Sequence, residues 1–250
     1  MSGKISIRGV NIDNVSMDEA VEIINTFAAS KEFHCVFTPN AEIVELCIEN
    51  EEIREIVNSA DLVVPDGAGV ILASKILNKK LKQKVAGVDL GDNAIKLAVE
   101  KGYKVFFLGG KPGIAELAAE KLAEKHKGFV PVGTNDGYFQ KQGEESDKII
   151  EKINALDVDI LFVCLGVPVQ EKWICENREK LKRVGLVMGL GGSLDAYSGN
   201  VKRAPEIFIK LNLEWFYRLI KEPKRIGRMM KLPKFVFGTI LYKITGKDKK

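Results

Sequence analysis

Short runs of apolar, β-branched residues alternate along this chain with segments of helical periodicity, and this alternation restricts the fold more than any other feature. It is typical of α/β proteins, in which helices cover both faces of a mostly parallel sheet. The predicted strands are Lys4–Val10, Phe33–Thr38, Asp61–Val64, Lys104–Leu108, Phe129–Val132, Val158–Leu165 and Leu186–Leu190. The inner strands are almost continuously apolar, as expected when both of their faces are buried.

The segments between the predicted strands begin with recognisable helix starts. Ser16 and Glu19 form a capping box in front of a helix predicted over Met17–Ser30. Asn40 can cap a helix over Ala41–Asn50. We therefore predict an α/β protein with a mostly parallel sheet.

The last fifty residues differ in charge from the rest of the chain. Residues 201–250 contain 14 Lys and Arg against 4 Asp and Glu, a net charge of +10, whereas the whole chain carries +4. Residues 1–200 therefore carry about −6, with 24 basic and 30 acidic residues. We predict a catalytic domain over residues 1–200 and a basic appendage over 201–250, in which Pro223 and Pro233 break the helices. The appendage would bind an anion: nucleic acid, acidic phospholipid or a phosphorylated substrate.

Several classes of protein do not fit the composition. No secretory signal is visible at the start, and the longest apolar run of the appendage, Phe235–Tyr242, has eight residues. A membrane-spanning helix needs about 20, so we expect none. The four cysteines form no CxxC pair, which favours buried thiols in a reducing cytoplasm, and the two histidines lie in dissimilar settings, which disfavours a histidine metal site.

Glycine-rich turns follow several of the predicted strands. In open parallel sheets, ligands bind beyond the carboxyl ends of the strands. Glycine allows backbone N–H groups to approach a phosphate there, and the helix that follows favours negative charge. Taken singly, Gly109-Gly110 is more often a tight strand–helix turn, and Gly191-Gly192 could equally be close packing at a strand exit. No GxGxxG fingerprint is present, which argues against a dinucleotide site.

Asp66 is a sharper candidate. Aspartate in Pro65-Asp66-Gly67 is ordinarily a turn residue, but this one directly follows an apolar strand. It should therefore lie at the functional edge of the sheet, facing Thr38 and Asn40 if their strands are neighbours.

Asp157-Val158-Asp159 has the form of the DxD metal motif of many nucleotide-sugar enzymes, but it opens a strand instead of following one. We expect a solvated turn at the opposite edge.

Together these motifs resemble one known family. In chain order they are Thr38-Pro39-Asn40-Ala41-Glu42, Pro65-Asp66-Gly67, Val85-Ala86-Gly87-Val88-Asp89-Leu90, Asp136-Gly137-Tyr138-Phe139, Gly166-x-Pro168-x-Gln170-Glu171, Gly191-Gly192-x-x-Asp195 and Arg203-Ala204-Pro205, followed by the stretch from Leu213 to Arg228. The chain resembles the WecG/TagA/CpsF glycosyltransferases over nearly its whole length. Lys84 and Val169 stand where many members would have Arg and Lys.

The resemblance implies a Rossmann-like sheet within an overall fold unlike the two common glycosyltransferase folds. It implies an inverting transfer from a UDP-sugar to an undecaprenyl-diphosphate-linked sugar at the cytoplasmic face of the membrane. The TagA branch is the most similar. It moves N-acetylmannosamine from UDP-ManNAc to the 4-hydroxyl of GlcNAc-diphospho-undecaprenol, making the linkage unit of wall teichoic acid. ManNAc uronic acid or glucose stays open as the donor sugar.

The resemblance also implies roles for individual residues. Asp66 would be the general base, Thr38 and Asn40 would orient the donor sugar or the nucleophile, and Gln170 would hydrogen-bond the sugar or the diphosphate. UDP would be held by Gly109, Gly110, Gly137, Tyr138, Gly166, Gly191, Gly192 and Asp195. Arg218, Arg225 and Arg228, with Lys221 on the same helical face, would neutralise the diphosphate without a metal or other cofactor.

Plainer readings exist for these residues. Thr38 and Asn40 could be only a strand end and a helix cap, Gln170 a surface amide, and the arginines a solvated face.

Two rival classes stay open from the sequence alone. One is a nucleotide-dependent oxidoreductase or methyltransferase, and the other is a non-enzymatic adaptor for membrane or nucleic acid. The aromatic residues of the appendage lie in an amphipathic stripe and are not interleaved as stacking platforms, which disfavours nucleic acid as a partner. The same stripe could dock on the body, lie in the membrane interface, or self-associate into a homo-oligomer.

Overall fold

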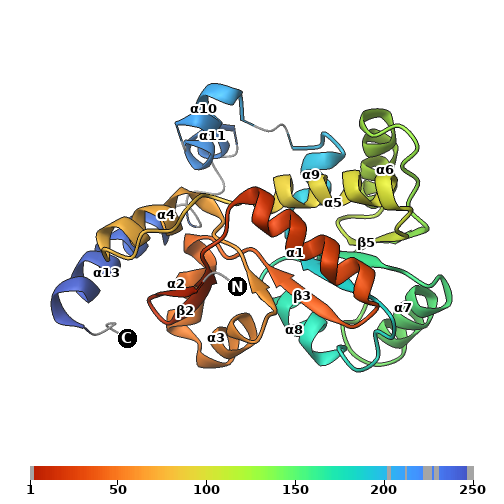
Figure 1. The fold of residues 1–250 in the computed structure, drawn as a ribbon, viewed down its shortest axis with the longest axis horizontal. Helices are drawn as coiled ribbons and strands as arrows, with labels where there is room; N and C mark the ends of the chain where they lie inside the picture. Colours follow the sequence, from red (N-terminus) through yellow and green to blue (C-terminus); the bar gives the residue numbers. More distant parts are fainter. Residues whose placement is uncertain (1–2, 202–203, 212, 222–226, 228–230, 247–250) are drawn as a thin grey trace.

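The computed structural model describes residues 3–201, 204–211, 213–221, 227 and 231–246 (Figure 1). Its centre is a six-stranded sheet in which every neighbouring pair of strands is parallel. In spatial order the strands are β4 (Leu62–Val63), β3 (His34–Phe37), β8 (Leu186–Gly189), β7 (Ile160–Cys164), β5 (Val105–Gly109) and β6 (Gly133–Asn135). The predicted α/β fold with a mostly parallel sheet is confirmed.

Helices cover both faces of this sheet, as Figure 1 shows. The helices of the body are α1 (Met17–Ser30), α2 (Ala41–Glu49), α3 (Glu51–Asn58), α4 (Gly67–Ile76), α5 (Gly87–Lys101), α6 (Ile114–Lys125), α7 (Glu144–Ala155), α8 (Val169–Glu176) and α9 (Ser193–Tyr197). Alternate residues of the inner strands enter two separate cores: Phe106 joins the core beneath α2, α3, α7 and α8, and Phe107 joins the core beneath α1, α5 and α6. This two-sided burial explains why the inner strands are almost continuously apolar.

The helix starts read from the sequence are present. The Ser16 hydroxyl accepts a hydrogen bond from the Glu19 N–H at 3.2 Å, and the Glu19 carboxylate accepts from the Ser16 N–H at 2.7 Å. Asn40 Oδ1 accepts from the N–H groups of Glu42 and Ile43, at 2.9 and 3.2 Å. Each cap satisfies backbone donors that the first helical turn leaves unpaired.

Two predicted strands differ from the structure. The strand predicted over Lys4–Val10 ends at Ile7, and β1 (Lys4–Ile7) pairs with β2 (Val10–Asp13) in a two-stranded antiparallel hairpin separate from the main sheet. Arg8 and Gly9 form its turn with φ of 49° and 88°, as a two-residue hairpin requires. The strand expected over Phe129–Val132 lies further along the chain as β6. Val130 is 77% exposed, and only Phe129 and Val132 of this segment pack against the cores.

The appendage is helical, with α10 (Glu206–Lys210), α11 (Glu214–Lys221) and α13 (Lys231–Thr245) among the described residues. Pro233 was expected to break a helix but lies inside the first turn of α13, where the missing N–H would have had no helical partner. Pro223 lies outside the described residues.

Helix α13 packs on α2 and α4 at the left of Figure 1. Its Phe235 and Thr239 are fully buried, and Phe235 belongs to the core of the body. Beneath it lies a buried ion pair between Arg8 and Glu45, 2.5 Å apart. The absence of a side chain at Gly238 lets the Arg8 guanidinium approach the helix, since a Cβ there would lie 2.7 Å from Arg8 Nη1. Among the described residues, none of the helices is both long and apolar enough to cross a bilayer.

Candidate active site

A cavity of about 580 Å³ lies at the carboxyl edge of the parallel sheet, and its size is typical of small-molecule sites. The structure brings most of the predicted site residues to its walls. These are Thr38, Asn40, Asp66, Gly110, Gly137, Tyr138, Gly166, Gln170, Gly191, Gly192 and Asp195.

Asp66 lies beside Thr38 and Asn40 because β3 and β4 are neighbours, with Phe37 paired to Val63 in register. A Cβ on Gly67 would lie 3.4 Å from Asn40 Cβ, so the two loops touch. Asp66 occupies the N-cap position of α4, yet its carboxylate does not cap that helix. Aspartate at an N-cap ordinarily bonds to the helix, and Asp66 does not.

Asn40 and Thr38 combine a structural bond with exposure to the cavity. Asn40 uses its oxygen to cap α2, and its amide nitrogen has no partner among the described residues. The Thr38 hydroxyl donates to the Gly189 carbonyl at 3.3 Å. The plain readings of a cap and a strand end are therefore correct, but they leave the Asn40 amide as a donor for a ligand.

The glycine turns shape the cavity more than they supply free donors. The N–H of Gly110 donates to the Cys164 carbonyl at 3.2 Å, and the N–H of Gly137 donates to the Gly110 carbonyl at 2.8 Å. Gly109 does not line the cavity. Its φ is +132°, and a Cβ there would collide with the Cys164 carbonyl, so it is a close-packing position between β5 and β7. Tyr138 is 71% exposed at the rim.

Gln170 is not the surface amide of the plain reading, because it is only 2% exposed. Its Nε2 donates to Glu171 Oε1 at 2.8 Å, and its Oε1 accepts from the Gly191 N–H at 2.9 Å. Glu171 is 1% exposed, and burial raises the pKa of its carboxyl to about 7, although the bond from Gln170 acts in the opposite direction. Its other oxygen, Oε2, is buried with no hydrogen-bond partner among the described residues.

The appendage contributes residues to the cavity wall that the sequence analysis did not identify as site residues. Glu214 and Trp215 of α11 and Leu232 of α13 form part of its wall. Lys84 Nζ and Glu214 Oε2 form an ion pair at 3.0 Å, with both side chains less than a fifth exposed. Lys84 and Lys111 are the cations among the described wall residues. Lys84 drew notice in the sequence only because it replaces an expected arginine.

The predicted arginines of the appendage cannot be compared with this geometry. Arg218 falls on α11, but its side chain lies outside the described part of the chain. Arg225 and Arg228 lie outside it altogether.

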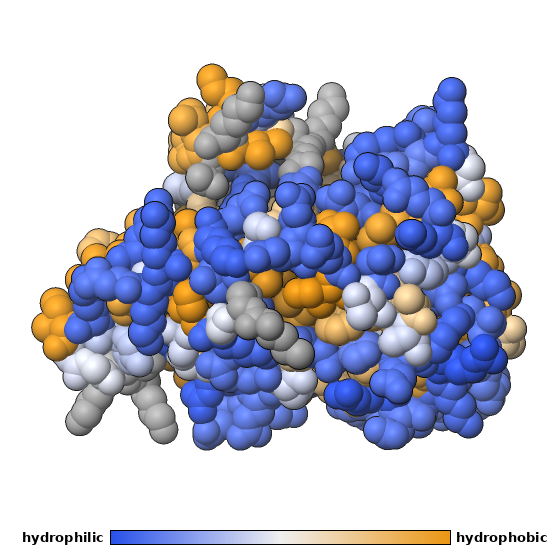
Figure 2. Space-filling view, viewed as in Figure 1, coloured by the Kyte–Doolittle hydropathy of each residue, from blue (hydrophilic) through white to orange (hydrophobic). Residues whose placement is uncertain are grey.

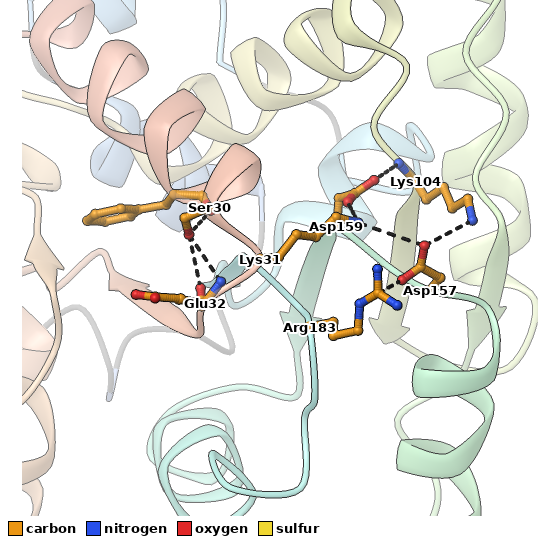
Figure 3. Close-up of polar contacts among 8 residues, drawn as sticks. Ser30, Lys31, Glu32, Lys104, Asp157, Asp159 and Arg183 are labelled. Carbon is orange, nitrogen blue, oxygen red and sulfur yellow. Dashed lines mark hydrogen bonds and ion pairs between the residues drawn. The ribbon is translucent and has the colours of Figure 1, made fainter.

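Asp157 and Asp159 lie at the opposite edge of the sheet, as predicted (Figure 3). Asp157 is partly exposed and lies 3.5 Å from both Lys104 Nζ and Arg183 Nε. Asp159 is not solvated: it is 6% exposed, accepts from the Lys104 N–H at 2.8 Å and pairs with Lys31. The pair therefore fastens the entry of β7 to β5. Within the described residues, no three His, Cys, Asp or Glu side chains gather where they could hold a metal ion.

The parallel sheet and the cavity at its carboxyl edge define a Rossmann-like α/β enzyme with a small-molecule site. A model of the glycosyl transferase WecG/TagA/CpsF family matches residues 5–249, and the chain belongs to this family. It is 35% identical over 238 residues to the N-acetylglucosaminyldiphosphoundecaprenol N-acetyl-beta-D-mannosaminyltransferase of Staphylococcus aureus strain MW2, covering 94% of this chain and 92% of that protein. Proteins of the same name from strains NCTC 8325 / PS 47 and COL match to the same extent.

These matches confirm the resemblance read from the motifs and the prediction of an enzyme. The chain is a glycosyltransferase, so the rival classes of oxidoreductase, methyltransferase and non-enzymatic adaptor find no support.

Proposed function

We propose that this enzyme moves N-acetylmannosamine from UDP-ManNAc to the 4-hydroxyl of GlcNAc-diphospho-undecaprenol, inverting the anomeric centre and making the linkage unit of wall teichoic acid. The activity named for the Staphylococcus aureus relatives supports this reaction class. The observation that carries the proposal is the placement of Asp66, Thr38 and Asn40 together in a nucleotide-sized cavity at the carboxyl edge of the sheet.

The order of the strands suggests how the two substrates lie. Asp66 and Thr38 follow β4 and β3 at one end of the sheet, whereas Gly110 and Tyr138 follow β5 and β6 at the other. In our proposal the nucleotide lies over the turns after β8, β7, β5 and β6, and the sugar points toward β3. The acceptor then enters from the side of α4, α11 and α13, where Leu232 forms part of the wall.

Asp66 would act as the general base that removes the proton from the acceptor hydroxyl as this oxygen attacks the anomeric carbon. A positioned base of this kind contributes about 10²–10⁴-fold to the rate. Asn40, through its unused amide hydrogens, and Thr38 would orient the donor sugar or the attacking hydroxyl.

Fixed cations would stabilise the departing diphosphate in place of a metal ion. Lys84 and Lys111 stand in the cavity wall, and Arg218, Arg225 and Arg228 of the appendage would join them. Because Glu214 already pairs with Lys84, a bound diphosphate would compete with a carboxylate from the appendage. With Trp215, Leu232 and these arginines, the appendage would complete the active site.

We further propose that the enzyme is bound peripherally to the cytoplasmic face of the membrane. On α13, Phe237 and Ile244 are 73% and 76% exposed, and Ile240 is 41% exposed. Figure 2 shows apolar surface at the left end of the molecule, where α13 lies. An apolar face on a segment with a net charge of +10 matches an anionic lipid surface.

Turnover with a panel of UDP-sugars and a synthetic lipid-diphosphate-GlcNAc acceptor tests the proposal. UDP-ManNAc should give the fastest transfer, and UDP-ManNAc uronic acid and UDP-glucose should be poor donors. Faster transfer from either of these would reassign the donor, and no transfer from any UDP-sugar would refute the reaction.

A further inference from the structure

A buried carboxyl group lies one residue from the cavity wall, in a place where the proposed chemistry gives it no direct task. Glu171 is on the first turn of α8, next to Gln170, and both side chains are almost completely buried. Burying a carboxyl group is costly unless its oxygens are hydrogen-bonded, yet Oε2 of Glu171 has no such bond among the described residues. Its other oxygen, Oε1, accepts a hydrogen bond from Gln170.

We propose that Glu171 is a positioning residue that acts through Gln170 to fix the turn at Gly191 and to direct an amide hydrogen of Gln170 at the donor substrate. The proposal rests on the proposed function, because it assumes that the cavity binds a UDP-sugar.

Two bonds in series carry this inference. Glu171 Oε1 accepts from Gln170 Nε2 at 2.8 Å, and Gln170 Oε1 accepts from the Gly191 N–H at 2.9 Å. A glutamine amide can turn over by 180° with almost no change of shape, so its orientation depends on its partners. The Gly191 N–H can only donate, so it requires the oxygen of the Gln170 amide on its side. The amide nitrogen then faces Glu171, whose Oε1 accepts from it.

This orientation has a consequence inside the cavity. An amide nitrogen carries two hydrogens, and Glu171 takes one of them. The second has no acceptor among the described residues, while Gln170 lines the cavity. The locked amide therefore presents a donor to an oxygen-rich ligand, whereas the flipped amide would present a carbonyl oxygen that repels a diphosphate.

The same series of bonds sets the position of the turn after β8. Gly191 has a φ of +54° and begins the turn that carries Gly192, Ser193 and Asp195 into the cavity wall. The bond from its N–H to Gln170 fastens this turn to α8 on the neighbouring strand connection. Gly189 leaves room for this contact, because a Cβ there would lie 3.2 Å from Gln170 Nε2.

Four proteins test the inference: Glu171→Met, Glu171→Gln, Gln170→Met and the double variant Glu171→Met/Gln170→Met. Met fills a similar volume without accepting a strong hydrogen bond, and Gln retains an oxygen that can accept from Gln170. Thermal melting of each variant checks that it is folded.

The first measurement is amide hydrogen exchange at Gly191 by NMR, without substrate. Glu171→Met should accelerate this exchange about tenfold or more, and Glu171→Gln should restore slow exchange. Unchanged exchange in Glu171→Met would overturn the inference whether or not the enzyme transfers sugar.

The second measurement is the KM for the UDP-sugar donor. Glu171→Met should raise it about tenfold, the effect of roughly one hydrogen bond, and Glu171→Gln should stay within about threefold of the wild type. Glu171→Met should add nothing when Gln170 is already replaced by Met. Additive effects, or equal damage from Met and Gln at position 171, would overturn the inference. Failure of the wild type to use any UDP-sugar would instead refute the proposed function, and Gly191 exchange would still test the positioning role.

Discussion

Replacing Glu171 by Gln should increase the free energy of unfolding at pH 8.5 by about 3 kcal/mol and leave it almost unchanged at pH 4. Burial raises the pKa of this carboxyl group from its ordinary value of 4.5 to about 7 in the folded protein. One pKa unit corresponds to about 1.4 kcal/mol, so this interval corresponds to about 3 kcal/mol.

The sign follows from the two protonation states. Below pH 4.5 the carboxyl group is protonated in both the folded and the unfolded chain, and it contributes no pH dependence. Between pH 4.5 and 7 the unfolded chain loses its proton while the folded chain keeps it, so stability falls as the pH rises. Above about pH 7 both states are ionised and the full penalty remains. The amide introduced by Glu171→Gln cannot ionise and escapes this loss.

Urea unfolding of the wild type and Glu171→Gln at pH 4, 5.5, 7 and 8.5 measures the effect. Glu179→Gln is the matched control, because Glu179 is exposed just after the same helix and its replacement should change the free energy of unfolding only slightly. A difference for Glu171→Gln that stays constant across this range, or decreases as the pH rises, would refute the reasoning.

Four further predictions concern the appendage and the chemistry. Phe235→Ala should lower the free energy of unfolding by about 3–5 kcal/mol in urea titrations, because Phe235 is fully buried. Phe237 is exposed, so Phe237→Ala should change this free energy by less than about 0.5 kcal/mol. Equal effects of the two substitutions would mean that α13 is not docked on the body. Phe237→Ser and Ile244→Ser should weaken flotation with anionic vesicles but not thermal stability, and unchanged flotation would place the lipid contact elsewhere. Deletion of residues 201–250 should abolish transfer to a lipid-linked acceptor and leave a less stable body whose folding circular dichroism can detect; a fully active truncation would contradict this. EDTA should not slow the intact enzyme, and inhibition by EDTA that a divalent ion reverses would contradict the absence of a metal ion from the reaction.

Much of the fold could be predicted because its signals are local. Strands buried on both faces must be apolar at every position, and the Ser16–Glu19 capping box fixes a helix start within four residues of sequence. The errors fall where local sequence and tertiary packing disagree. An arginine in the left-handed region at Arg8 gave no sign of a turn, and the apolar Val130 faces solvent.

The site could be located from the residues that follow each strand, because parallel strands gather their carboxyl ends at one edge. The exact set of residues that line the site could not be predicted, because it depends on contacts between residues far apart in the sequence. Lys84 meets Glu214 across 130 positions of sequence, and Gly109 is required by the backbone of β7 instead of by a ligand. The burial of Glu171 was also hidden, since a Gln-Glu pair at a helix start is ordinarily a polar surface feature.

The rate of sugar transfer by Asp66→Asn, measured together with UDP affinity, tests the assignment of the base most directly. Asn keeps the size of the side chain but cannot accept the proton from the acceptor hydroxyl. We predict that transfer from UDP-ManNAc to the lipid-linked acceptor falls by about 10²-fold or more, with UDP binding close to that of the wild type. Near-normal transfer by Asp66→Asn would contradict the assignment of Asp66 as the base.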